Sequence, residues 1–504
     1  MRRPSKDFSA RPLRIAAFLG LTLLGAGLAV GSVTASLLSS GQRQLAAGQY
    51  AAARETFQAA VTRHYSDAAA HFGLGLALDH LKDYQAARFE FQEVLRLKPG
   101  LPEAEYNLGV VYQQLGNTSA AIVAYRAALG GSSKLTAAQR LETNRNLAAL
   151  EVQAGNHAAA AKLDQAALKL APKDLKLWLD TAEQLYLAGQ AVSASSPLHL
   201  GGTATALPYA YHVLARQPGN VKAVELIADV YLSQKLTNQA LQVLHGGIAA
   251  ATTPLDRAAL LRARSRIEES GGQVAAELAD LKRAVRLVPG DASGQLLYAQ
   301  ALLRNAQPRR ALVHFEAALM ADSTSGAAML GIALVEEHLG ANLLAAEDAA
   351  SAVRLTHTAS VKRAAQFLEA RSDYRSGHFT EALPLLQELA AQKPTVSVQL
   401  WLGLTEFSLK KYSAAMRSLA AAEQADPQNL LIAADLGGAA LAAGHFNAAA
   451  KVLRAVVQAQ PKNGQAWYNL GWSLRGQGHL LQAKAAFKKA LALGYAPAKA
   501  ALGG

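Results

Sequence analysis

Cysteine is absent from this sequence of 504 residues. The absence excludes disulfide bridges, thiolate metal sites, a cysteine nucleophile and a lipid-modified N-terminal cysteine. The fold must therefore be stabilised by packing alone. Because secreted and cytosolic chains both occur without cysteine, this feature does not decide the compartment.

Patterns typical of β-strands are also scarce. β-Branched residues rarely alternate with polar ones, proline totals 16, and alanine dominates the remaining stretches, which predicts an all-α chain. Apolar residues make up 51% and charged residues 17% of the sequence, so the chain is too apolar to be disordered and too long for one ordinary core. We expect several domains or an array of repeats.

Catalytic and cofactor-binding motifs are missing. The sequence lacks a phosphate-binding loop, a dinucleotide-binding glycine fingerprint, an HExxH zinc motif, an EF-hand loop and a nucleophile elbow. Its 13 histidines are scattered, and the group Glu336, Glu337 and His338 lacks the partners that an active site needs. We therefore expect a protein that is not an enzyme and that binds no cofactor and no metal.

Positive charge is in excess, with a formal net charge of +13 at pH 7, and part of it lies at the N-terminus. Residues 1–14 contain five basic side chains and one acidic side chain. Elsewhere lysine and arginine occur singly along helical stretches, which indicates a solvated surface and not a nucleic-acid partner.

A long apolar segment follows these basic residues. Residues 15–38 carry no charge, and about 20 helical apolar residues cross a bilayer core. The positive-inside rule places residues 1–14 in the cytoplasm. The sequence thus predicts a transmembrane signal anchor over 15–38, a single-pass inner-membrane location and a periplasmic remainder. The alternative is a secreted protein, because Val33-Thr34-Ala35 has the small residues at which a signal peptide is cleaved.

A unit of about 34 residues recurs along the chain. Residues 104–129 are AEYNLGVVYQQLGNTSAAIVAYRAAL, and residues 466–491 are AWYNLGWSLRGQGHLLQAKAAFKKAL. Both have an aromatic residue and a Leu-Gly pair in a first helix, a glycine at a turn, and a small and an aromatic residue in a second helix. This pattern resembles the tetratricopeptide repeat (TPR) family.

The resemblance implies an all-α, right-handed superhelical α-solenoid of about 13 helical hairpins over residues 36–495. One hairpin of short amphipathic helices does not bury its own apolar face, so each hairpin must stack on its neighbours. Small residues such as Gly75, Gly109 and Gly471 are expected to let the backbones approach, while Phe91 and Phe487 fill the space between hairpins.

One irregular segment divides the array. Residues 191–207 are rich in serine, glycine, threonine and alanine, a composition typical of flexible linkers. We expect this insertion to separate a first TPR block, 36–190, from a second block, 208–495, with a tail at 496–504. Whether the insertion has a function is open.

In TPR proteins the first helices line a concave groove that binds peptide segments, and the resemblance implies the same here. Aligned to the repeat, the candidate groove residues are Tyr106, Asn107, Arg145, Asn146, Lys176, Tyr186, Phe367, Arg371, Tyr374, Phe407, Tyr468 and Trp472. Asn107 and Asn146 occupy equivalent places on successive first helices, where an amide binds either a peptide backbone or a neighbouring repeat. Glu103 and Asp180 stand where one subfamily carries the cations of a carboxylate clamp, so capture of a C-terminal carboxylate is not supported.

These features favour a non-catalytic scaffold of a bacterial cell envelope that binds protein partners in the groove. A carbohydrate-binding factor in exopolysaccharide export is the alternative, since exposed aromatic rings stack on sugars. A third interpretation is an accessory subunit of a membrane enzyme complex. The identity of the partner and the oligomeric state are not encoded in any motif.

Overall fold

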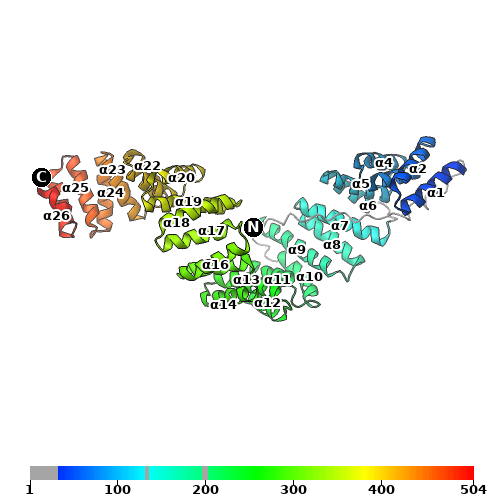
Figure 1. Cartoon of the computed structure of the whole chain (residues 1–504), viewed down its shortest axis with the longest axis horizontal. Coiled ribbons are helices and arrows are strands. Elements are labelled where there is room, and N and C mark those ends of the chain that lie inside the picture. The colour runs from blue at the N-terminus through cyan, green and yellow to red at the C-terminus, as the bar shows by residue number, and fades with distance from the viewer. Residues whose placement is uncertain (1–31, 131–134, 196–201, 504) are drawn as a thin grey trace. The chain divides into compact units, whose positions relative to one another are not determined.

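The computed structural model describes residues 32–130, 135–195 and 202–503, and all regular secondary structure in these ranges is helical (Figure 1). Helices α1 to α26 pair in chain order into thirteen hairpins, and a short helix, α27, follows them. The prediction of an all-α repeat solenoid is confirmed. Contacts divide the chain into two compact units, of which one ends at Ala263 and the other begins at Arg264.

The first unit contains six hairpins. Its helices are α1 (Ser32–Ala46), α2 (Tyr50–Arg63), α3 (Ala68–His80), α4 (Tyr84–Leu97), α5 (Pro102–Gln114), α6 (Thr118–Gly130), α7 (Ala137–Gln153), α8 (His157–Leu170), α9 (Leu175–Ser195), the 3-10 turn η2 (Gly202–Ala206), α10 (Leu207–Leu214), α11 (Val221–Ser233) and α12 (Thr237–Ala250). The predicted insertion, 191–207, thus holds the end of α9 and η2, and its residues 196–201 lie outside the described residues.

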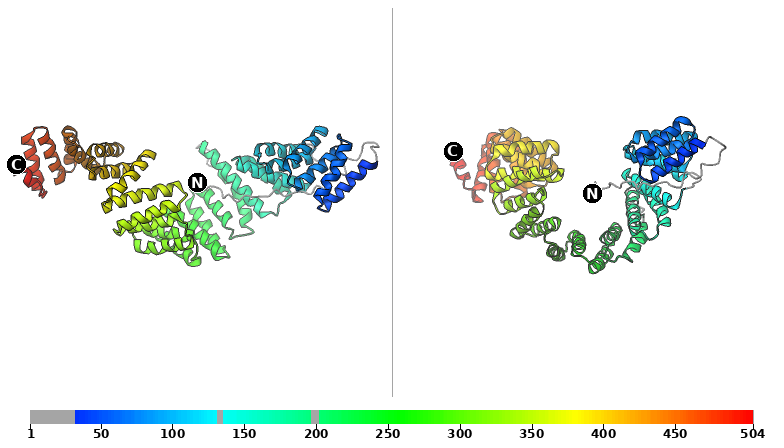
Figure 2. Two further views of the ribbon diagram at one scale, coloured as in Figure 1. Left: turned by 45° about the horizontal axis from the view of Figure 1, so that its top comes forward. Right: turned by 45° about the vertical axis from the view of Figure 1, so that its right-hand side comes forward.

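The division between the units falls within α13 (Pro254–Ser270). The helices that follow are α14 (Val274–Leu287), α15 (Ala292–Arg304), α16 (Pro308–Ala321), α17 (Gly326–His338), α18 (Asn342–Leu355), α19 (Ala359–Ser376), α20 (Phe379–Gln392), α21 (Val396–Ser408), α22 (Tyr412–Ala425), α23 (Leu430–Ala442), α24 (Phe446–Ala459), α25 (Gly464–Gly476), α26 (Leu480–Ala492) and α27 (Ala498–Gly503). Within each unit, consecutive hairpins lie side by side in chain order (Figure 2).

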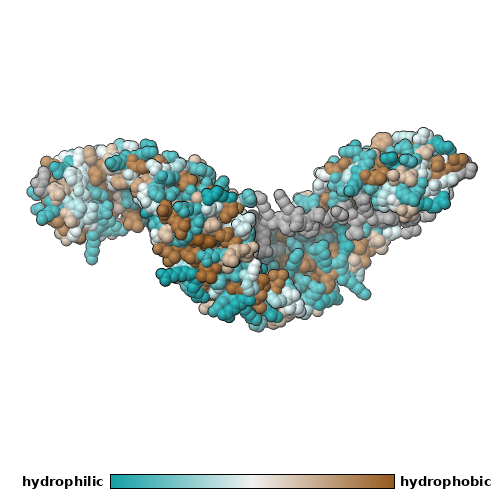
Figure 3. Space-filling view, viewed as in Figure 1, coloured by the Kyte–Doolittle hydropathy of each residue, from teal (hydrophilic) through white to brown (hydrophobic). Residues whose placement is uncertain are grey.

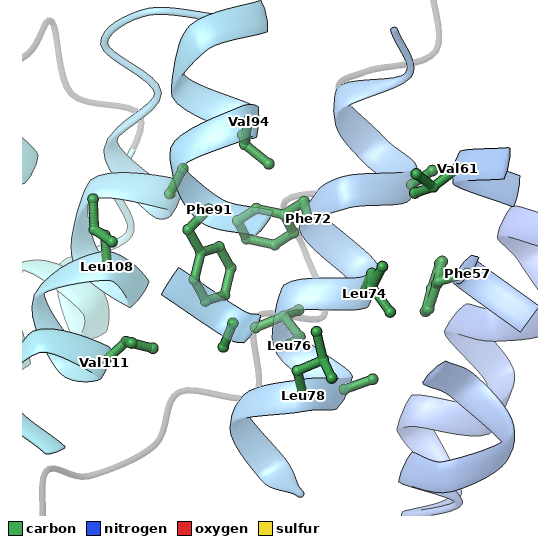
Figure 4. Packing of buried hydrophobic residues seen from close by; sticks show 14 of the residues in the cluster. Phe57, Val61, Phe72, Leu74, Leu76, Leu78, Phe91, Val94, Leu108 and Val111 are labelled. Atoms are coloured by element: carbon green, nitrogen blue, oxygen red, sulfur yellow. The ribbon is translucent and has the colours of Figure 1, made fainter. Parts of the chain in front are cut away.

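Close packing between the two helices of a hairpin depends on glycine. Phe91 of α4 is fully buried, and a Cβ atom added at Gly75 of α3 would lie 2.9 Å from its Cε1. The ring of Phe72 meets Phe91 edge-on, with 5.7 Å between centroids (Figure 4). A Cβ at Gly109 would lie equally close, 2.8 Å, to the ring of Tyr125. Glycine on the first helix therefore makes room for the aromatic residue of the second helix, so these rings also pack within their own hairpin and not only between hairpins.

The predicted membrane span is wrong where the structure describes it. Ser32 begins α1, an ordinary first helix of a hairpin, in which Thr34 is buried and Leu37 and Leu38 pack against the apolar core that begins with α2 and α3. Residues 32–38 are therefore part of the array. Cleavage after Ala35 would remove the first turn of α1.

None of the helices in the described ranges is long and apolar enough to cross a bilayer. The predicted single-pass inner-membrane location is contradicted by this finding. The basic residues 1–14 and the first part of the predicted span, residues 15–31, lie outside the described residues.

Apolar side chains also gather on the surface over α16–α18 (Figure 3), where Val313, Met320, Leu343 and Leu344 are exposed. All four residues belong to second helices of their hairpins. None of them lines the cavity described next.

Candidate functional site

Three successive first helices of the second unit, α21, α23 and α25, share one packing pattern. A Cβ atom added at Gly403 of α21 would lie 2.6 Å from Cγ of Leu419, and one added at Gly437 of α23 would lie 2.6 Å from Cγ of Leu453. In α25 the corresponding glycine faces a phenylalanine of α26. One face of each first helix is thus fixed against its own second helix, which also fixes the direction of the residues around the glycine.

A cavity of about 660 Å³ lies along these three helices. In each helix two residues line the cavity: the one directly after the packing glycine and the one four positions after that glycine. They are Leu404 and Phe407 in α21, Gly438 and Leu441 in α23, and Trp472 and Arg475 in α25. The other lining residues are Leu419, Ala434, Asp435, Ala442, Phe446, Gln465, Asn469 and Gly476. The repeat therefore builds one continuous lining from equivalent positions of three hairpins.

The lining is mainly apolar and is open at one glycine. Phe407 is 39% exposed, and Trp472 is half-buried with the guanidinium of Arg475 at 5.1 Å from its ring centroid. A Cβ atom at Gly438 would meet only the Nδ2 of Asn469, at 3.7 Å. Gly438 therefore leaves free space in the middle of the cavity, where a ligand backbone has room to approach.

Four polar side chains line the cavity as well: Asp435, Gln465, Asn469 and Arg475. Asp435 is exposed, yet the walls of the cavity place protein atoms around its carboxyl group, and this partial burial raises its pKa above the ordinary value. In the described part of the chain, the Asp435 carboxylate makes no ion pair. Two amides and two opposite charges thus line one mainly apolar cavity, a composition that suits a ligand with both apolar and polar groups.

Tetratricopeptide repeat models match residues 38–102 and 367–429, residues 406–471, and residues 103–130 and 464–493. The chain thus contains tetratricopeptide repeats in both of its units. No curated protein sequence matches the chain.

Two solved structures are similar to this TPR chain along most of its length. The structure of Naa15/Naa10 bound to HypK-THB shows 15% identity and a TM-score of 0.43, covering 91% of this chain and 75% of that chain. The APC/C hetero-tetramer Cut9-Hcn1 shows 14% identity and a TM-score of 0.37, covering 96% of this chain and 97% of that chain.

The structure places two of the predicted groove residues of this TPR protein, Phe407 and Trp472, in the cavity. Tyr468, also predicted, does not line it. Its ring packs against Phe487 and Tyr495, with centroid distances of 5.8 Å and 5.1 Å. Tyr468 therefore belongs to the apolar core of the last repeat.

Three other predicted groove residues of the second unit, Phe367, Arg371 and Tyr374, contact side chains within that unit. Arg371 donates two hydrogen bonds to the carboxylate of Glu337, at 2.7 Å and 2.5 Å, and its guanidinium lies 5.4 Å from the ring centroid of Phe367. Tyr374 meets the ring of Trp401 edge-on at 5.2 Å. These side chains lie outside the cavity lining.

In the first unit, Tyr106 and Asn107 are buried, with 2% and 7% of their surface exposed. Tyr106 packs against the ring of Tyr125, and Asn146 of α7 lies beside both tyrosine hydroxyls. Tyr186 accepts a hydrogen bond of 2.6 Å from Gln190. Tyr106, Asn107 and Tyr186 are therefore engaged within the repeats, whereas the buried Nδ2 of Asn146 has no hydrogen-bond partner among the described residues.

Charges predicted for the groove of the first unit are paired as well. Arg145 forms an ion pair with Asp174, and Nζ of Lys176 lies 3.3 Å from Asp180. Burial, together with the charge of Asp180, raises the pKa of the nearby Asp164 to about 7, although Arg145 and Lys176 lower it. The cations thus compensate neighbouring carboxylates.

The sequence-based selection missed Asp435, Gly438, Gln465 and Asn469. A signal for Asn469 was present, because AWYNLG repeats the AEYNLG that contains Asn107. Asp435 stands at the same place, two residues before the packing glycine. Whether Asp435 has a counter-ion depends on side chains that come together only in the folded chain.

Proposed function

We propose that this chain is a non-catalytic scaffold that holds an extended segment of a partner protein in the cavity lined by α21–α25. The tetratricopeptide repeats support a protein-protein interaction role. The observation that carries the proposal is the cavity of about 660 Å³, whose lining repeats from one first helix to the next. The backbone of an extended peptide repeats at regular intervals, and the equivalent lining residues of successive first helices also recur at regular intervals.

The lining supplies both parts of peptide recognition. The apolar surface formed by Phe407, Leu441 and Trp472 accepts a large apolar side chain, and burying such a side chain contributes about 1.5–3 kcal/mol. The amides of Gln465 and Asn469 each offer a donor and an acceptor to a peptide backbone. Nothing in the described residues favours the carbohydrate-binding alternative over a peptide ligand.

A substitution that fills the cavity without straining the fold tests this proposal. In Gly438→Leu the new Cβ atom meets only an ordinary contact, and the rest of the side chain occupies the cavity. Gly246→Leu is the matched control, since Gly246 lies in α12 with nothing within 4 Å of its added Cβ atom. Both variants exchange a helical glycine for leucine.

The wild-type full-length chain and both variants are immobilised and used to select binders from a displayed library of random linear peptides. We expect the wild type and Gly246→Leu to enrich the same peptides and Gly438→Leu to enrich none of them. Equal enrichment by Gly438→Leu would show that this cavity is not the binding site.

A further inference from the structure

Two opposite charges lie in the proposed binding cavity without a partner of opposite sign. Asp435 of α23 and Arg475 of α25 both line it. In the described part of the chain neither side chain makes an ion pair or a hydrogen bond, and the Arg475 guanidinium lies 5.1 Å from the ring centroid of Trp472. These two charges are therefore available to a ligand.

Two charged residues on other first helices of the second unit, Glu337 and Arg304, are compensated within the protein. Glu337 of α17, only 8% exposed at its side chain, is held by Arg371 and Arg375. Arg304 of α15 binds the side chain of Glu277 at 2.5 Å. Asp435 and Arg475 differ from these residues in having no counter-ion among the described residues, although both line the same cavity.

Binding of a peptide changes the energy of both charges. A segment seated in the cavity excludes water from Asp435, and a carboxylate that loses water without gaining a cation is strongly destabilised. The walls of the cavity already remove part of the hydration of Asp435, which raises the pKa of its carboxyl group. A ligand that places a cation beside this carboxylate avoids the penalty, while a neutral or acidic group at the same place is rejected.

We propose that the cavity recognises a peptide segment with one large apolar side chain, a lysine or arginine that pairs with Asp435, and an aspartate or glutamate that pairs with Arg475. The apolar side chain lies against Phe407, Leu441 and Trp472. The two charges sit on different helices, α23 and α25, so they also fix the direction in which the segment runs. This inference rests on the proposed function and adds the chemical class of the ligand.

Charge reversal provides the test. Full-length wild type, Asp435→Lys, Arg475→Glu and the double variant each select binders from the displayed library of random linear peptides. For the wild type we expect enriched peptides with an apolar residue, a basic residue on one side of it and an acidic residue on the other. Asp435→Lys should exchange the basic preference for an acidic one and keep the apolar residue, and the double variant should reverse both charges.

Affinities of synthetic peptides make the result quantitative. The peptide preferred by the wild type should bind Asp435→Lys at least about tenfold more weakly, and its charge-reversed counterpart should recover that loss. Circular dichroism melting curves confirm that the variants remain folded. Recovery by the reversed peptide also excludes a general defect of the variant.

Two failures are distinguishable. Unchanged peptide preferences in Asp435→Lys and Arg475→Glu, with binding still abolished by Gly438→Leu, would overturn the charge assignment and leave the cavity as the binding site. Binding that survives Gly438→Leu would overturn the proposed function itself. Selection of peptides whose only acidic group is the terminal carboxylate would also overturn the assignment of an acidic side chain to Arg475.

Discussion

The side-chain amide of Asn107 donates a hydrogen bond of 2.7 Å to the backbone oxygen of Glu103, one turn earlier in α5. Asn469 occupies the same position of the repeat in α25 but lines the cavity, and its side chain makes no hydrogen bond to any other described residue. Both asparagines stand in the same local sequence, YNLG. Asn107 has a hydrogen-bond partner within its own helix, whereas Asn469 is left for a ligand.

The first prediction compares these two asparagines. Asn469→Ala should weaken the selected peptide by up to about tenfold, because one hydrogen bond contributes about 0.5–1.5 kcal/mol. Asn107→Ala should leave peptide affinity unchanged and alter stability by no more than about 1 kcal/mol. Fluorescence anisotropy with a labelled peptide and melting curves measure the two effects. Weaker binding in Asn107→Ala would place the ligand in the first unit instead.

Two adjacent glycines of α23 should respond in opposite directions to alanine. A Cβ atom at Gly437 would lie 2.6 Å from Cγ of Leu453, which is fully buried, so Gly437→Ala should cost about 1–3 kcal/mol through overpacking. At Gly438 the added atom has space, and Gly438→Ala should stabilise the helix by about 0.5–1 kcal/mol.

Urea unfolding of the two alanine variants beside the wild type provides the measurement. The two substitutions are chemically identical and differ by one position, so propensity and solvent effects are matched. A loss of stability in Gly438→Ala would mean that the space around Gly438 is already filled.

The fold was predictable because its determinants are local. Gly109 and Tyr125 lie within one hairpin, and their spacing recurs, so the close approach of helices follows from the repeat alone. Phe407 and Trp472 were found in the same way, by alignment to the repeat. Hydropathy assigned 32–38 to a membrane span, although Leu37 and Leu38 of this segment pack against the apolar core of the array.

The polar part of the site was not predictable from these patterns. Arg145 and Arg371 have the spacing of groove cations, but each pairs with a carboxylate of another repeat, Asp174 or Glu337. Asp435 lacks such a partner. Whether a charge is compensated depends on side chains about one repeat away, and that relationship is visible only in the folded chain.

The raised pKa of the buried Asp164 carboxyl group leads us to expect a loss of stability as pH rises. Its side chain is 6% exposed, and burial with the nearby charge of Asp180 raises its pKa from 3.8 to about 7. At a pH between these two pKa values, Asp164 is protonated in the folded chain and ionised in the unfolded chain. The free energy of unfolding therefore falls with increasing pH. Asp164→Asn should remove this dependence.

The expected gain follows from the size of the shift. One pKa unit corresponds to about 1.4 kcal/mol, so at about pH 8 the Asp164→Asn variant should exceed the wild type in stability, on the order of a few kcal/mol. At about pH 4 the two should be nearly equal. Glu316→Gln, a substitution of an exposed carboxylate in α16, is the control. A constant difference between Asp164→Asn and wild type at both pH values would contradict the assignment.

Removal of the last hairpin tests the repeat architecture and the site together. In a linear array each repeat contacts mainly its neighbours, so deletion of residues 464–504 should leave the remaining hairpins helical. The deletion takes α25, and with it Gln465, Asn469, Trp472 and Arg475, so peptide binding should disappear. Truncation after Pro497 is the control, because it removes α27 and keeps every residue that lines the cavity. Circular dichroism per residue and peptide anisotropy measure the two properties. Loss of helical signal beyond the deleted residues would indicate one indivisible core, whereas binding retained without α25 would move the ligand to another part of the chain.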